Sequence, residues 1–280
     1  MVDKKTHLWD KKASTFLRYN EELNAVQKGV FEALSGWCVE FAGKSLIDIG
    51  CGTGVWTLHL AQKAKSVVGV DSSQAMLKVL QEDAKRLNLS NVLPVNLNFE
   101  EFYGDFTSKK GEFGGSLPNS SGFVSEYSDN ATSQSRKRVS AKHLSTEKFD
   151  IAFVSMSPAL NKNEDYQAFM ALAPLKIFVG WQEYRQSDFL EPIFKAFNAK
   201  QKCFDDDDME NFLRKNGIKF KKKVFEEIRH SEKPRAIAIE NALWHLNMAG
   251  IEPSTDELDK LIKGESIKET IQSKIKLLVF

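Results

Sequence analysis

A short apolar strand followed by three glycines at alternate positions is the clearest chemical feature of the sequence. Residues 45–54 read Ser-Leu-Ile-Asp-Ile-Gly-Cys-Gly-Thr-Gly, and a helix-like run, 55–65, follows at once. Glycine permits backbone conformations that other residues rarely adopt, and it lets a ligand lie directly against the main chain. The sequence therefore predicts a ligand-binding turn that faces the start of a helix.

A second acid lies at the end of the next strand-like run. Asp71 follows residues 66–70, and its distance of 17 residues from Gly54 suits one helix and one strand between them. A carboxylate there can accept hydrogen bonds from two ribose hydroxyls. Capping the following helix is the simpler alternative for Asp71, but Ser72 or Ser73 would do that equally well, so we favour ligand binding.

The glycine spacing separates two kinds of nucleotide site. A dinucleotide-binding fingerprint requires G-x-G-x-x-G, and Val55 occupies the place of its third glycine, which here comes one residue early at Gly54. A G-x-x-x-x-G-K-[ST] phosphate loop is also absent. Asp48, just before the glycines, would repel a pyrophosphate but can accept hydrogen bonds from an ammonium group or orient the turn. These features favour a ligand with an amino-acid end and a ribose.

The block 46–54 resembles the first motif of class I S-adenosylmethionine-dependent methyltransferases. The resemblance extends through residues 68–73 with Met76-Leu77, like the second motif of that family, and continues more weakly at 97–102 and 149–155. It covers roughly residues 45–180 apart from an insertion. It implies S-adenosylmethionine as the cofactor and methyl transfer as the activity.

The resemblance also assigns roles to individual residues. It places the main chain of Gly50, Cys51 and Gly52 against the methionine end of the cofactor, Asp48 at the amino group and Asp71 at the ribose hydroxyls. Cys51 would contribute main chain as a small filler and would not act as a nucleophile.

The remaining cofactor contacts implied by the resemblance lie downstream. Ser72 would lie beside the adenosine, Asn98 and Phe99 at the edge and face of the adenine, and Ser155 near the sulfonium. Many family members have Asp where this chain has Asn98, although an amide oxygen still accepts the adenine amino proton. Phe99 fits an ordinary core position equally well. No catalytic residue is identified, because a sulfonium methyl already is a strong electrophile.

The apolar pattern shows which elements position these residues. Two amphipathic helices are expected from the helical spacing of residues 9–17 and 26–37. After the turn, strands and helices alternate, as in βαβ units with a parallel sheet. The expected strands are 46–49, 66–70, 92–97, 149–154, 175–179, 219–228 and 274–280, and the expected later helices are 76–87, 164–172, 205–216, 236–249 and a short one from Ser254.

The whole chain, residues 1–280, is expected to form one doubly wound α/β domain. Its sheet would be Rossmann-like, seven-stranded and mostly parallel, with a C-terminal antiparallel strand. The first 42 residues would form an N-terminal helical cap, and residues 232–268 a helical addition before the last strand. Residues 103–147 are rich in Ser, Gly, Lys and Asn with almost no apolar periodicity, so we expect a loop or disordered insertion there.

Composition indicates an ordinary soluble, cytoplasmic protein. Of 280 residues, 42% are hydrophobic and 28% charged, and the net charge of +1 gives no electrostatic reason to expect nucleic acid or a membrane as partner. The odd, scattered cysteines Cys38, Cys51 and Cys203 favour a reducing compartment. The charged N-terminus lacks the apolar core of a signal peptide, and no run is apolar enough to span a bilayer.

Other candidate groups favour simpler interpretations. Asp205–Asp208 reads as the acidic start of a helix and not as a metal site, because adjacent helical residues do not converge on one point. No metal is therefore expected. His230 and His245 are candidate proton acceptors, for which surface or interface positions are favoured.

The methyl acceptor must be inferred from the segment after the strand 149–154. Methyltransferases that act on base amines or glutamine amides typically have Asp/Asn-Pro-Pro-aromatic there, whereas this chain has Ser157-Pro158-Ala159-Leu160. We therefore expect a small-molecule acceptor, covered by an aromatic lid of Trp9, Phe16 and Tyr19 and walled by the later helices.

Two alternatives stay open. An RNA or protein methyltransferase is supported only by the basic residues of the insertion, which are Lys109, Lys110, Arg136, Lys137, Arg138 and Lys142. A non-catalytic protein that binds S-adenosylmethionine is the other. The oligomeric state is not determined by the sequence.

Overall fold

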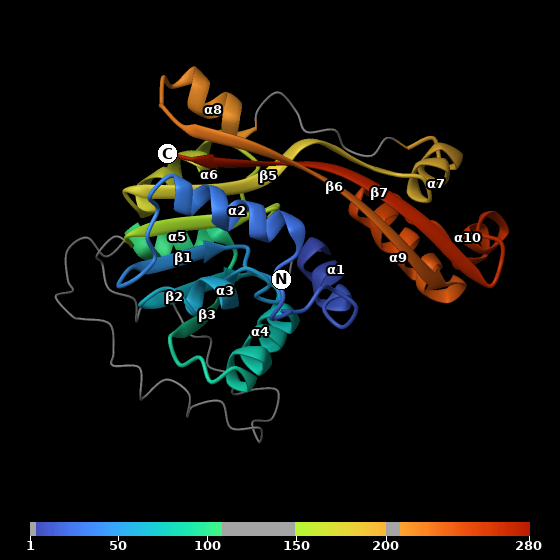
Figure 1. Cartoon of the computed structure of the whole chain (residues 1–280). Coiled ribbons are helices and arrows are strands. Elements are labelled where there is room, and N and C mark those ends of the chain that lie inside the picture. Colours follow the sequence, from blue (N-terminus) through green and yellow to red (C-terminus); the bar gives the residue numbers. More distant parts are fainter. Residues whose placement is uncertain (1–3, 108–148, 200–207) are drawn as a thin grey trace.

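The computed structural model describes residues 4–107, 149–199 and 208–280, and these form an α/β structure (Figure 1). The strands are β1 (Ser45–Ile49), β2 (Ser66–Asp71), β3 (Val92–Asn96), β4 (Ile151–Ser155), β5 (Leu175–Ser187), β6 (Lys221–Pro234) and β7 (Ser266–Val279). The helices are α1 (Lys4–Lys12), α2 (Ala25–Gly36), α3 (Thr57–Ala61), α4 (Gln74–Arg86), α5 (Phe99–Thr107), α6 (Asn163–Leu172), α7 (Leu190–Ala196), α8 (Met209–Lys215), α9 (Arg235–Met248) and α10 (Thr255–Leu261).

The described strands form one seven-stranded sheet in the order β3-β2-β1-β4-β5-β7-β6 (Figure 1). Neighbours from β3 to β5 are parallel, while β7 runs antiparallel to both β5 and β6. The order reverses between β1 and β4, so the turns after these strands meet at a topological switch point. This confirms the expected Rossmann-like, mostly parallel sheet with a C-terminal antiparallel strand.

Helices cover both faces of the sheet because its central strands are apolar on both sides. Successive side chains of β1 alternate, so Leu46 packs with α2 and α3 while Ile47 packs with α5, α6 and α8. Both residues are fully buried. Asp48 comes next on the face shared with α2 and α3, which places a carboxylate beneath the glycine turn.

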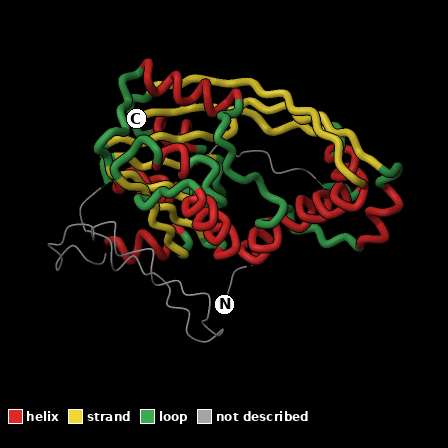
Figure 2. Tube along the Cα trace, turned by 60° about the horizontal axis from the view of Figure 1, so that its bottom comes forward, coloured by secondary structure: helices red, strands yellow, loops and turns green. Residues whose placement is uncertain are grey.

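The strands β5, β6 and β7 continue well beyond the central sheet and carry a separate small core (Figure 2). In this distal part, side chains of α7, α9 and α10 pack together around Phe194, Leu246 and Leu258. The sequence predicted only the inner part of each strand, because the outer parts carry many charged residues on a face that no described helix covers. The expected helical addition, 232–268, contains α9 and α10.

Several sequence-based boundaries are wrong, each for a local reason. The first helix ends at Lys12, because the chain turns there and runs to the glycine turn, where the Thr53 hydroxyl donates to Leu17 O at 2.5 Å. The helix expected over 55–65 shortens to α3. The helix α7 was missed because it is short and has no side-chain N-cap, unlike the equally short α8 and α10.

The insertion and the helix expected over 205–216 also begin at other residues than the sequence predicted. Residues 103–107 belong to α5 and not to a loop, whereas the rest of the insertion lies outside the described residues. The helix α8 starts at Met209 because Asp208 caps it by accepting from Asn211 N at 2.9 Å. Asp205–Asp207 and Cys203 lie outside the described residues.

Two predicted signals at helix termini are confirmed, one at the end of α9 and one at the start of α10. Gly250 follows α9 with φ of 85°, and Ser254 with Glu257 forms the capping box of α10. Among the described helices, none has the length and apolarity needed to cross a membrane.

Candidate functional site

The glycine turn lies between β1 and α3 and adopts a left-handed backbone at all three glycines. Gly50, Gly52 and Gly54 have φ of 68°, 55° and 84°, which a residue with a side chain would adopt only with strain. A Cβ built on Gly50 would overlap Ser157 Oγ, and one on Gly54 would overlap Leu80. A Cβ on Gly52 would have no neighbour within 4 Å. The turn is therefore packed on both sides and open at its centre, which fits a ligand lying on the main chain.

Asp48 lies beneath this turn in a dry position. Its exposed fraction is 2%, and Thr57 Oγ1 donates to its carboxylate at 2.6 Å. Burial raises the pKa of Asp48 to about 7, although the Thr57 hydrogen bond acts in the opposite direction, and the charge of Asp71 raises it further. A cation beside Asp48 would stabilise its ionised form.

The Asp71 side chain links the glycine turn to the turn that follows β2. Its carboxylate accepts from Gly52 N at 2.9 Å and from Ser73 N at 2.8 Å. Burial nevertheless raises the pKa of Asp71, and Asp10 adds to the shift. Asn96 Nδ2 donates to the carbonyls of Asp71 and Ser72 at 3.1 and 2.9 Å, which fixes the chain after β2.

Helix α1 lies over the adenosine side of the site that the sequence predicted. Asp10 accepts from Ser73 Oγ at 2.6 Å and from Ala75 N at 3.2 Å, at the beginning of α4. Thr6 donates to the partly exposed Ser72 at 3.3 Å. Asp10 is thus a third acid near Asp48 and Asp71.

The acids around the turn lack cationic partners. Within the described parts of the chain, no lysine, arginine or histidine forms an ion pair with Asp10, Asp48 or Asp71. Burial of a carboxylate without a counter-ion is costly, and it raises the pKa values of Asp48 and Asp71. These carboxylates therefore fit a ligand that carries positive charge, such as a sulfonium with an ammonium group. They do not fit a pyrophosphate, which is negatively charged.

The structure places the residues predicted to contact adenine in different surroundings. Asn98 is exposed and accepts from Glu101 N at 2.8 Å, so its side chain caps α5. Phe99 is 4% exposed and packs in the core between the sheet, α5 and α6. Their contacts with adenine stay predictions, as do the other assigned roles.

Cys51 and Ser155 lie at the edges of the turn. Cys51 is buried against Gly69, and burial raises the pKa of its thiol, which fits a small filler. Ser155 is partly exposed at the end of β4, and the next residue, Met156, has φ of 47°. A non-glycine residue in this conformation often marks a functional site.

Sequence reasoning missed four residues of the site, which are Asp10, Thr57, Asn96 and Ser157. Thr57 begins α3 directly after the glycine turn. This position was the one sequence signal that could have placed a missed residue beside Asp48. Asp10 and Asn96 carry no local pattern, because each acts through a contact more than 20 residues away in sequence.

Aromatic side chains join α1 to α9 on the open side of the site. Trp9 contacts Phe16 and Trp244, with ring centroids 5.8 and 4.9 Å apart. Trp244 Nε1 also donates to Leu8 O at 3.0 Å. Two of the three aromatic residues expected in a lid therefore meet. The third, Tyr19, is buried 4.6 Å from the ring of His59 instead.

The two candidate histidines lie in different surroundings. His245 on α9 lies 3.4 Å from Arg185, and burial, together with Arg185, Lys12 and Lys233, lowers its pKa to about 3. His230 is exposed on β6 beside Thr270. In the described parts of the chain, no three His, Cys, Asp or Glu side chains are placed to hold a metal ion.

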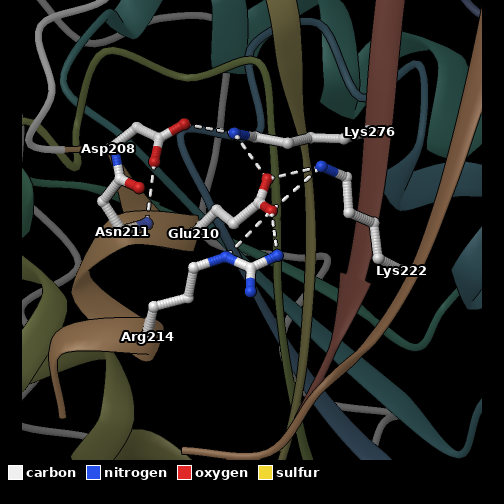
Figure 3. A network of polar contacts seen from close by, with 6 residues as sticks. All are labelled: Asp208, Glu210, Asn211, Arg214, Lys222 and Lys276. Carbon is white, nitrogen blue, oxygen red and sulfur yellow. Dashed lines mark hydrogen bonds and ion pairs between the residues drawn. The ribbon is translucent and has the colours of Figure 1, made fainter. Parts of the chain in front are cut away.

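A second polar cluster lies on the opposite face of the sheet, where α8 meets β6 and β7 (Figure 3). Glu210 accepts from Lys222 at 2.7 Å and from Arg214 at 2.8 Å, and Lys276 bridges Glu210 and Asp208. Burial alone would raise the pKa of Glu210, but the hydrogen bonds from Lys222 and Arg214 and the charge of Lys276 hold it at about 2. This cluster sets three cations against two acids, so the negative charge of Glu210 is compensated by side chains of the chain itself.

The strand order defines a Rossmann-like domain of the class I methyltransferase type. Residues 46–113 also match the family model of the methyltransferase domain. The chain thus carries a class I S-adenosylmethionine-dependent methyltransferase domain, and S-adenosylmethionine is the cofactor that this domain implies.

Sequence relatives match part of the chain. The chain is 38% identical over 86 residues to 23S rRNA (uracil(1939)-C(5))-methyltransferase RlmD of Aliivibrio salmonicida, which is 31% of this chain and 19% of the relative. It is 41% identical over 86 residues to RlmD of Salmonella typhi, again 31% of this chain and 19% of the relative. The chain thus spans about a fifth of the length of these relatives.

Among solved structures, magnesium protoporphyrin IX methyltransferase from Synechocystis aligns over 99% of both chains, with 15% identity and a TM-score of 0.44.

Proposed function

We propose that this protein is an enzyme that transfers the methyl group of S-adenosylmethionine to a small-molecule acceptor by direct displacement. The observation that carries the proposal is the set of three acids, Asp10, Asp48 and Asp71, around an open glycine turn. S-adenosylmethionine has a sulfonium and an ammonium group as well as ribose hydroxyls, so it complements this set in charge and in hydrogen bonding.

The proposed cofactor orientation follows from the positions of the acids. Asp48 would face the ammonium group, and Gly50, Cys51 and Gly52 would present main chain to the methionine end. Asp71 would accept from the ribose hydroxyls, with Ser72 beside the adenosine. The hydrogen bonds that Asp71 makes to Gly52 N and Ser73 N hold both turns in the required relation before the ligand binds.

Methyl transfer would rest on alignment. A sulfonium methyl is electrophilic, so the protein must hold a nucleophile in line with it and exclude water, and orientation of this kind lowers a barrier by roughly 7–11 kcal/mol. A general base is needed only for an acceptor that is protonated at the working pH. We assign no catalytic residue.

The enclosure by α1 and α9 supports a small acceptor. Helix α1 is bound to the start of α4 through Asp10, and Trp9 meets Trp244 of α9. A site beside which two helices meet suits a small molecule better than a polymer.

Calorimetry with S-adenosylhomocysteine tests the cofactor, and NAD⁺ is the matched ligand that carries ribose and adenine on a pyrophosphate. We expect S-adenosylhomocysteine to bind and NAD⁺ to give no heat. Absence of binding by S-adenosylhomocysteine and S-adenosylmethionine would contradict the proposal. Binding without transfer of labelled methyl to a fractionated metabolite extract would favour a non-catalytic binding protein.

An RNA acceptor is the second candidate, and the identity with RlmD over 86 residues favours it. The basic residues that would support it in the insertion lie outside the described residues. Incubation with labelled S-adenosylmethionine and total RNA, beside the metabolite extract, distinguishes the two acceptors. Label in RNA, with binding that falls steeply as salt rises, would replace the small-molecule proposal.

A further inference from the structure

The two edges of the sheet differ in how well they are protected. At one edge, β3 has five residues and includes Pro94, which cannot donate a backbone hydrogen bond. At the other edge, β6 has 14 residues and pairs with β7 alone. Among the described residues, no backbone hydrogen bond links β6 to any other segment on its outer side. An edge strand of this length is a ready template for another strand.

The outer strand also exposes apolar side chains. Val224 is 40% exposed and Ile228 is 64% exposed, and both lie on the face of the sheet that carries Lys222. Helix α8 covers this face beside Lys222 through Glu210. The apolar residues nearby are therefore exposed where a neighbouring strand would cover them.

The sequence of β6 is complementary in charge to its own reverse. Residues 221–227 read Lys-Lys-Lys-Val-Phe-Glu-Glu, with cations before an apolar pair and anions after it. In an antiparallel pair related by a two-fold axis at Val224, Lys221 would lie opposite Glu227 and Lys222 opposite Glu226. The same register places Val224 opposite itself and Ile228 opposite Phe220, so the exposed apolar residues meet.

We propose that β6 is a homodimer interface, at which a second copy of this chain adds its own β6 in antiparallel register about Val224. Two seven-stranded sheets would then form one continuous sheet. The pairing is isologous, so it closes after two copies and leaves only the short β3 edges free. Opposite charges directly across antiparallel strands stabilise the pair, and like charges there destabilise it.

Charge reversal tests the register through the mass of the protein in solution. We expect light scattering on the full chain to give twice the monomer mass of 31.7 kDa. Lys221→Glu and Glu227→Lys should each weaken dimerisation about tenfold or more, since each places like charges in contact twice. The double variant K221E/E227K should restore the dimer. Lys78→Glu, on the exposed side of α4, is the control and should leave the mass unchanged.

Cross-linking gives a second measurement that does not depend on charge. In a variant with Cys38 and Cys203 replaced by serine, Val224→Cys should form a disulfide between copies, because opposite residues of antiparallel strands are close enough. Ile228→Cys should not, since the two copies of residue 228 would be about 26 Å apart at ~3.3 Å per residue.

A monomer at every concentration would overturn the proposal. A dimer that is unaffected by either single charge reversal, or that cross-links equally at both positions, would also overturn it. Circular dichroism of each variant separates loss of the dimer from loss of the fold.

Discussion

Two buried acids on opposite faces of one sheet have pKa values that are shifted in opposite directions. Asp48, beneath the glycine turn, has one hydroxyl donor, and its pKa rises to about 7. Glu210, on α8, is surrounded by Lys222, Arg214 and Lys276, and its pKa falls to about 2. Burial acts alike on both, so the difference comes from the counter-charges.

This difference separates an acid that stabilises the fold from one that is ready for a ligand. The chain supplies every partner of Glu210, whose negative charge is already neutralised (Figure 3). The chain supplies no cation to Asp48 among its described residues, so Asp48 is the acid at which we expect a positively charged ligand to bind. Four predictions test this comparison, from the largest expected effect to the smallest.

Of the four predictions, the replacement of Glu210 should have the largest effect, which is a loss of stability. Glu210→Ala removes the acid that pairs with Lys222 and Arg214, and it leaves Lys276, which is 2% exposed, with Asp208 as the one remaining acid of the cluster. Breaking a buried ion pair in this way costs about 3–5 kcal/mol of unfolding free energy. Urea unfolding measures the loss, and Glu32→Ala on the exposed side of α2 is the control, expected within about 0.5 kcal/mol of wild type. A loss as small as that of the control would show that the cluster adds no stability.

The pH dependence of stability should have opposite signs in the two regions. Glu210 has a lowered pKa, so its contribution is complete above its ordinary value of 4.5 and is lost as the pH falls towards 2. Asp48 has a raised pKa, so stability is greatest below its ordinary value of 3.8 and falls as the pH rises through about 7. At about 1.4 kcal/mol per pKa unit, the contribution amounts to about 3 kcal/mol for Glu210 and about 4 kcal/mol for Asp48.

The variants Glu210→Ala and Asp48→Asn isolate these contributions. Relative to wild type, Asp48→Asn should become more stable as the pH rises from 4 to 7, whereas Glu210→Ala should lose its disadvantage as the pH falls below 4.5. Unfolding free energies measured across pH give both curves. Parallel curves for the two variants would contradict the comparison.

Replacement of Asp71 should affect binding more than stability. Asp71→Asn removes a charged hydrogen-bond acceptor, worth about 1.5–3 kcal/mol, so the affinity for S-adenosylhomocysteine should fall roughly 10- to 150-fold. Asp150→Asn is the matched control, because Asp150 accepts from Ser45 at the other end of the sheet. Calorimetry measures both affinities, and equal losses in the two variants would remove Asp71 from the site.

The smallest effect should come from the hydroxyl beside Asp48. Thr57→Val removes the one hydrogen bond that opposes the raised pKa of Asp48, and we expect the pKa to rise by about one unit, equivalent to 1.4 kcal/mol. The affinity for S-adenosylhomocysteine below that pKa should fall about tenfold and recover at higher pH. Calorimetry at several pH values measures this shift, and an unchanged pH profile would show that Asp48 does not face the ammonium group.

Much of the fold was predictable because its signals are local. The period of the apolar residues marked the inner strands and most helices, and the glycines with Asp71 marked the site. Strand ends were less accurate, since the outer parts of β5, β6 and β7 are held by pairing with one another and not by burial of their own side chains. The helix α7 and the contacts of Asp10 depend on residues far away in sequence.

The sequence by itself determined the alternation of strands and helices, the glycine turn, and the acids before and after that turn, Asp48 and Asp71, because each depends on neighbouring residues. Only the tertiary structure decided which acids have counter-ions. The free energy of a buried charge depends on groups that distant segments bring to it, so Asp48 and Glu210 became distinguishable only after the sheet placed α3 beside one and β6 and β7 beside the other.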